Sequence, residues 1–155
     1  MKQNAKEIVQ DWMNYMFPST TYLWEGFNVP APKTTYLGIN LTTHRILNMD
    51  VYTAPNSEGI ARVTGDREVT LVVKCYGEDA DLLLDLCNKM RTTRHIDYCW
   101  EQGIAFTILS GPNDITGPIT ASQWQQQGIL ELNLRYRFTM DDEVGVIETV
   151  LSKQI

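Results

Sequence analysis

The chain has 155 residues, of which 43% are hydrophobic, 10% aromatic and 21% charged. These are the proportions of a folded globular protein, and they exclude a fibrous or intrinsically disordered chain. Thirteen basic and nineteen acidic side chains give a net charge of −6, which argues against a general affinity for nucleic acid or for an anionic membrane. At this length we expect one domain over residues 1–155.

The sequence also indicates where the protein is made. No apolar stretch approaches the roughly 20 residues needed to cross a bilayer, and the first residues contain no signal-peptide core. Three cysteines, an odd number, fit reduced thiols better than a disulfide framework. We therefore expect no membrane partner and a protein that is made and kept in a cytoplasm.

The first half of the chain predicts one helix followed by extended segments. Residues 4–16 carry apolar side chains at helical spacing, with Asn4 as the N-cap, and Pro18 closes the helix. The elements expected after it are an extended segment at 20–24, a loop at 28–33, a strand at 36–41 with 45–53 as its continuation or hairpin partner, a turn or exposed loop followed by another turn within 54–67, and a strand at 69–75.

The second half begins with a central helix over about 78–91, whose first turn is acidic and whose end is basic, as the helix dipole favours. A long extended stretch at 122–138 has the clearest alternation of the chain, with one apolar and one polar face. The other expected elements are a strand at 104–109, a turn-rich loop at 111–117, a turn at Asp141-Asp142, and a last strand or short helix over 144–151.

This order of helix, strands, helix and strands predicts an α+β fold without the regular alternation of a parallel sheet. The expected architecture is an antiparallel β-sheet with two main helices packed on one face. Such a sheet leaves one face and two edges available, and partners could add there.

The search for catalytic chemistry gives one weak candidate, a thiol site. His95 and Cys99 are four residues apart and would share a face if residues 92–100 were helical, but the cysteines behave in the pattern like core residues. The cysteines are twelve residues apart each time, which is not the spacing of a zinc site. Phosphate-binding and common hydrolase motifs are absent. We predict no catalytic residues, no cofactor and no metal.

Residues for contact with partners are more prominent. Trp124 lies in a polar part of the long extended stretch and is the best single candidate for an exposed anchor. Alternation places Arg135 and Arg137 on the polar face opposite Tyr136, which suits charge-paired protein contacts better than base stacking. The candidate residues for a subunit or partner interface are Trp124, Arg135, Arg137, Arg62 and Arg67.

One pattern extends over most of the chain. It comprises Val72–Gly77 (VVKCYG), an acidic-start helix, Gly103–Ala105, a proline-containing loop, and Leu130–Tyr136 (LELNLRY), together with the opening helix at 8–13. This order resembles the neck terminator (tail completion) proteins of tailed bacteriophages. Residues 50–68 depart most from that pattern.

The resemblance implies a structural role in the virion, after synthesis in the cytoplasm of the host bacterium. Proteins of this family have an antiparallel sheet flanked by helices. The resemblance implies that this chain forms a homo-oligomeric ring, a hexamer, which caps the tail tube protein and docks beneath the head connector or adaptor protein. The resemblance further implies that genomic DNA passes through the centre of this ring without sequence-specific binding. No catalytic residues are implied.

The acidic surplus fits this role in one of two ways. Residues 78–155 hold twelve acidic and six basic side chains, whereas residues 1–77 hold seven of each. Asp141, Asp142 and Glu143 could line a pore that repels phosphates, or they could face outward and only aid solubility. Two alternative classes remain open: a small cytoplasmic α+β enzyme or ligand-binding domain with a Cys99/His95 thiol site, and a host-interaction or anti-defence module.

Overall fold

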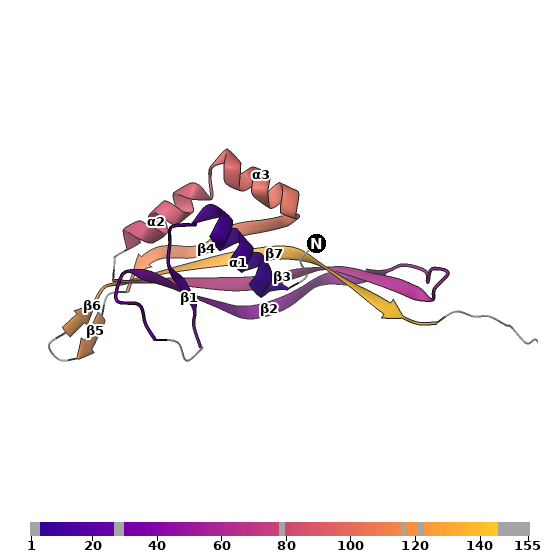
Figure 1. Cartoon of the computed structure of the whole chain (residues 1–155), viewed down its shortest axis with the longest axis horizontal. Helices are drawn as coiled ribbons and strands as arrows, with labels where there is room; N and C mark the ends of the chain where they lie inside the picture. Colours follow the sequence, from indigo (N-terminus) through magenta and orange to yellow (C-terminus); the bar gives the residue numbers. More distant parts are fainter. Residues whose placement is uncertain (1–3, 27–29, 78–79, 116, 121–122, 146–155) are drawn as a thin grey trace, which may run out of the picture.

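The computed structural model describes residues 4–26, 30–77, 80–115, 117–120 and 123–145 (Figure 1). Its elements in chain order are α1 (Ala5–Met16), β1 (Tyr22–Trp24), β2 (Tyr36–Tyr52), β3 (Ile60–Tyr76), α2 (Ala80–Lys89), α3 (Thr93–Gln102), β4 (Ile104–Asp114), β5 (Gly117–Thr120), β6 (Gln123–Gln125) and β7 (Gln127–Glu143). The predicted α+β class is confirmed.

The main sheet has five strands in the order β1-β2-β3-β7-β4. All neighbouring strands are antiparallel except β1, which pairs with β2 in parallel over residues 37–39. The small hairpin of β5 and β6 forms a separate two-stranded sheet. The long extended stretch predicted at 122–138 therefore corresponds to β6 and β7.

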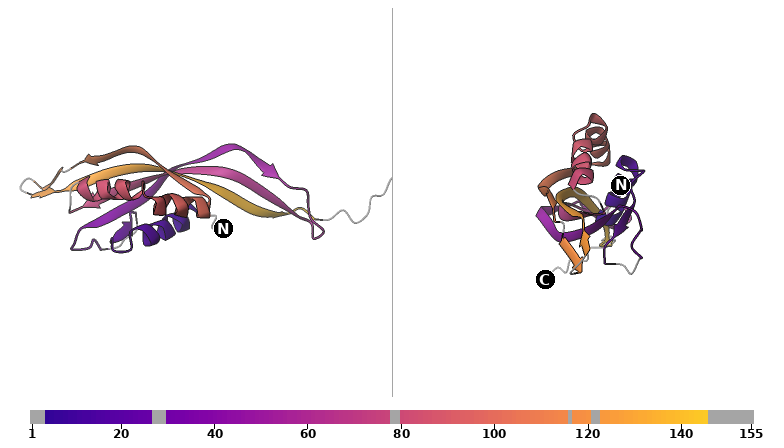
Figure 2. Two further views of the ribbon diagram at one scale, coloured as in Figure 1. Left: turned by 90° about the horizontal axis from the view of Figure 1, so that it is seen from above. Right: turned by 90° about the vertical axis from the view of Figure 1, so that its left-hand side faces the viewer.

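The core lies between one face of the sheet and the helices (Figures 1 and 2). Alternate residues of the central strands are fully buried, so that Val69, Leu71 and Val73 of β3 lie beside Leu134, Leu132 and Leu130 of β7. This period of two is what a strand with one buried face requires.

Helix α1 covers this face as the sequence predicts. Asn4 caps the helix by accepting a hydrogen bond of 2.9 Å from the backbone N–H of Lys6. The indole of Trp12 is fully buried and stacks on Phe106 of β4, with ring centroids 4.2 Å apart. The structure adds to the two predicted helices a third, α3, which begins at the N-cap Thr92 and ends at Gly103 in the left-handed conformation.

Beyond the helices, β2, β3 and β7 continue as a three-stranded extension, here called the arm (Figure 1). The arm consists of residues 45–52, 60–68 and 135–143, and it meets the start of β4 at residues 135 and 136. The whole strands β2, β3 and β7 have 17 residues each, or roughly 55 Å of extended chain. The helices cover only part of that length (Figure 1). Seen from above, the sheet twists strongly where the arm begins (Figure 2).

The strands correct three expectations about turns, two in the arm and one in β4. Residues 60–67, expected to contain a turn, belong to β3, and Asp141-Asp142 lies within β7. The loop expected at 111–117 is strand up to Asp114, and β4 instead accommodates its turn-forming residues through register shifts after Ile108 and Ser110. Residues 45–53 form the continuation of the preceding strand up to Tyr52.

Gly65 shows why the turn at this position was a wrong prediction. A side chain at residue 65 would collide with the carboxylate of Asp50, which lies over the glycine to reach Arg67. Gly65 therefore allows β2 and β3 to approach each other closely, and Gly65-Asp66 does not form a turn. The last strand or short helix expected at 144–151 lies largely outside the described residues.

Among the described residues, no helix has the length and apolar character needed to span a membrane.

We predict that Leu132→Ala destabilises the protein by about 2–5 kcal/mol, because it leaves a cavity in a fully buried part of the core. Met49→Ala in the arm is the control, since this side chain is 90% exposed. The measurement is equilibrium unfolding in urea. Equal losses in both variants would contradict this location of the core.

Candidate assembly interface

The thiol site is the first candidate that the structure locates. His95 and Cys99 lie one turn apart on α3, with 3.5 Å between the His95 Nε2 and the Cys99 Sγ, and both side chains are buried. Burial raises the pKa of Cys99 to about 11 and lowers the pKa of His95. At neutral pH the thiol therefore keeps its proton and the imidazole is uncharged, which is the reverse of a reactive thiolate pair.

Metal binding has no better candidate. In the part of the chain that the structure describes, no group of three or more His, Cys, Asp or Glu side chains could hold a metal ion.

The predicted arginines and acidic residues gather on the arm. Arg62 and Arg67 belong to β3, Arg135 and Arg137 to β7, and the acidic residues Asp141, Asp142 and Glu143 end β7. Trp124 lies apart from them in β6, where it pairs with Pro118 of β5. The side chain of Trp124 lies outside the described part of the structure, and its role as an anchor stays a prediction.

Arg67 and Asp50 form the best-defined ion pair of the arm. Two hydrogen bonds of 2.8 Å join the Nη1 and Nη2 atoms of Arg67 to the two carboxylate oxygens of Asp50. The side chains are only 15% and 18% exposed, and the guanidinium lies 4.7 Å from the ring centroid of Phe138. The hydrogen bonds from Arg67 lower the pKa of Asp50. This arrangement ties β2 to β3 and β7 where no helix covers the sheet.

The opposite face of the arm carries a second row of charges. Arg135 pairs with Glu68 at 3.2 Å, and Arg137 pairs with Asp66 at 3.4 Å. Arg45 of β2 reaches the same Glu68 at 3.7 Å. Hydrogen bonds from Asn133 and Arg135 lower the pKa of Glu68. Both arginines of β7 are thus paired within the chain, although each remains more than half exposed.

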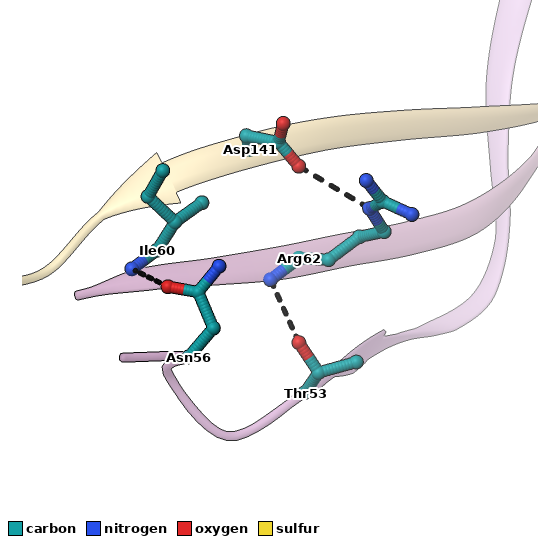
Figure 3. A network of polar contacts seen from close by, with 5 residues as sticks. All are labelled: Thr53, Asn56, Ile60, Arg62 and Asp141. Atoms are coloured by element: carbon teal, nitrogen blue, oxygen red, sulfur yellow. Dashed lines mark hydrogen bonds and ion pairs between the residues drawn. The ribbon is translucent and has the colours of Figure 1, made fainter. Parts of the chain in front are cut away.

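At the tip of the arm, polar side chains hold the three strands together (Figure 3). Asn56 accepts hydrogen bonds from the backbone of Glu58 and Ile60, and Thr53 accepts one of 2.8 Å from the backbone of Arg62. The Nε atom of Arg62 lies 3.2 Å from Oδ1 of Asp141. Asp141, Asp142 and Glu143 are all exposed, and Asp141 is paired with Arg62 within the chain.

The arm also exposes large apolar side chains that sequence reasoning missed. Ile46, Met49, Val51 and Tyr52 of β2 are between 66% and 90% exposed. The sequence pattern of residues 45–52 is typical of a half-buried strand. It does not show that the helices leave this part of the sheet uncovered. The acidic partners Asp50, Asp66 and Glu68 were missed too, because their pairing depends on strand register. The arm therefore combines strands joined by ion pairs with exposed apolar side chains, and such side chains mark places where proteins bind.

Comparison with known proteins agrees with an assembly role. A protein-family model described as phage neck terminator protein matches residues 4–155. A search of curated proteins gives no match.

We predict that Asp50→Asn lowers the melting temperature at pH 7 and that this effect vanishes in acid. The pKa of Asp50 lies below its ordinary value of 3.8, so its contribution is present above that value and is lost as the pH falls through the folded pKa. Thermal unfolding of both proteins between pH 7 and about pH 2 tests this. Asp66→Asn, in a more exposed ion pair, is the control and should change little.

We also predict that Cys99 reacts slowly with iodoacetamide at pH 7, because about one thiol in ten thousand is ionised when the pKa is about 11. Mass spectrometry of the alkylated peptide gives the rate, and the unfolded protein in urea is the control that should react quickly. Fast alkylation of Cys99 in the folded protein at neutral pH would support the alternative hypothesis of an enzyme with a Cys99/His95 thiol site.

Proposed function

Because the chain belongs to the family of phage neck terminator proteins, we propose that it forms a ring that ends the tail tube and joins it to the head connector. Family membership makes it a structural protein of the phage neck, located in the virion tail and associated with other tail and head proteins. The ring, its six copies and the passage of DNA through its centre are the proposal.

The observation that carries this proposal is the arm. It projects from the helix-covered part of the sheet (Figure 1), its strands are joined by ion pairs, and it exposes apolar side chains along β2. Large apolar side chains exposed on both faces of one edge strand are costly in water and mark a place where another protein binds. A ring subunit needs such a surface because each copy contacts its neighbours through two unlike patches.

The partners in this proposal are further copies of the chain, the tail tube protein, the head connector or adaptor protein, and the passing DNA. Trp124, Arg62, Arg67, Arg135 and Arg137 remain the proposed contact residues. The intrachain pairs change what these arginines offer. Arg67 is mostly buried, so Arg135 and Arg137, whose side chains are 61% and 58% exposed, are the better placed for a partner.

We further propose that the acidic end of β7 faces the central hole. Asp141 is paired with Arg62, so repulsion of DNA phosphates falls mainly to Asp142 and Glu143. Their exposure supports this role. A net charge of −6 keeps the chain from adhering to the genome as it passes.

Electron microscopy of the purified protein at high concentration, alone and with the tail tube protein, tests the proposal. We expect closed rings of six copies with a hole wide enough for duplex DNA. A reconstruction that places Asp142 and Glu143 on the outer rim would remove the acidic pore and leave the ring intact. Single subunits under both conditions would contradict the ring itself.

A further inference from the structure

Within the described segments, both edges of the main sheet are open along most of their length. At one edge, β4 has β7 as its one strand partner there. At the other, β1 covers β2 only at residues 37–39, so residues 40–52 of β2 have β3 as their one strand partner among the described segments. Open strand edges present unpaired backbone groups and are ready templates for a further strand.

Exposed apolar side chains gather on these two edge strands. Six of the thirteen large hydrophobic side chains exposed in the described part of the chain belong to β2 or β4, and central β3 has none. On β2 they are Ile46, Met49, Val51 and Tyr52, and on β4 they are Ile108 and Leu109. The segment 104–113 of β4 also contains no charged residue. Neither edge has a lysine, and it is the bulges of both strands and Pro112 of β4 that limit pairing with an arbitrary strand.

The directions of the two edges are complementary. Because β2 is antiparallel to β3, β3 to β7 and β7 to β4, the two edge strands run in opposite directions. When copies are arranged around a rotation axis with their strands tilted to that axis, β2 of one copy meets β4 of the next in the antiparallel sense. The tilt is needed because Arg45 lies level with Ala105 within one copy, so the outer part of β2 reaches β4 of a neighbour only if the copies are staggered along their strands. Antiparallel pairing is slightly more stable per residue than parallel pairing.

A groove at the β4 edge offers room for the side chains of an arriving strand. It has a volume of about 650 Å³ and is lined by Trp100, Ile104, Ala105 and Tyr136, with Arg135 and Arg137 among the lining residues. Trp100 is 87% exposed, although tryptophan is a residue that proteins usually bury in part. Met49 is 90% exposed on β2, and a flexible methionine adapts well to an irregular groove.

We propose that residues 45–52 of β2 dock on residues 104–109 of β4 in a second copy of this chain. The repeated contact joins copies head to tail, and it rests on the proposed function because a ring requires two unlike edges. Bulges interrupt both strands, after Thr42 and Leu47 in β2 and after Ile108 in β4. Backbone pairing is therefore confined to short runs, and apolar side chains supply most of the contact.

The test places a lysine on each edge in turn, under conditions in which the wild-type protein forms rings. Val51→Lys and Leu109→Lys each bury an unpaired charge in the contact and should raise the concentration needed for assembly at least about a hundredfold. Leu84→Lys on α2, an equally exposed leucine away from both edges, should assemble like the wild-type protein. Native mass spectrometry reports the number of copies, and thermal unfolding confirms that all three variants are folded.

Mixing the two edge variants makes the test specific. The Val51→Lys protein keeps an intact β4 edge and the Leu109→Lys protein keeps an intact β2 edge, so an equimolar mixture should form a one-to-one dimer and stop there. Rings formed by either edge variant would overturn the docking and leave the proposed ring standing. Loss of assembly in only one of the two edge variants would also overturn the docking, and so would a mixture that forms no dimers. Failure of the wild-type protein to form rings would overturn the proposed function and this inference with it.

Discussion

The rest of the structure depends on the register between β3 and β7. These strands pair without interruption from Ile60 opposite Glu143 to Tyr76 opposite Gln127. Beneath the helices, burial of Leu71 beside Leu132 fixes that register, because a slip of one residue would turn every apolar side chain of a strand to the other face. The arm inherits the same register. The hydrophobic core thus determines which side chains meet well beyond the reach of any helix.

The side chains on the helix-covered face of the sheet change in type from the core to the arm. Where helices cover the sheet, this face consists of valine and leucine, and farther out it presents Arg67, Phe138 and Met140. Ala61 and Val63 are still buried on this face of the arm, and the bidentate pair of Arg67 with Asp50 also ties the strands together. Stability in the arm therefore has an electrostatic component, which is lost in acid.

Much of this fold could be predicted from local pattern. The helix at 4–16 and the alternation at 130–138 are visible in the sequence because their period reports one buried face. The sequence pattern wrongly predicted turns in the arm, at Gly65 and at Asp141-Asp142. Residues that are typical of turns make contacts between strands there. Such contacts join residues up to 79 positions apart, and no local signal encodes them. The predicted arginines do gather on the arm, but their acidic partners became visible only once the register was known.

The irregularities of β2 give a physical reason why an exposed apolar edge need not cause aggregation. Thr43 and Asn48 have positive φ angles, and both lie within the register shifts of β2. Threonine rarely adopts this conformation, so the surrounding strands must hold it in place. A bulged and twisted edge offers no long run of backbone groups to an arbitrary strand. In the docking that we propose, recognition depends on the positions of Ile46, Met49 and Val51, and a partner must match their shape before it can pair.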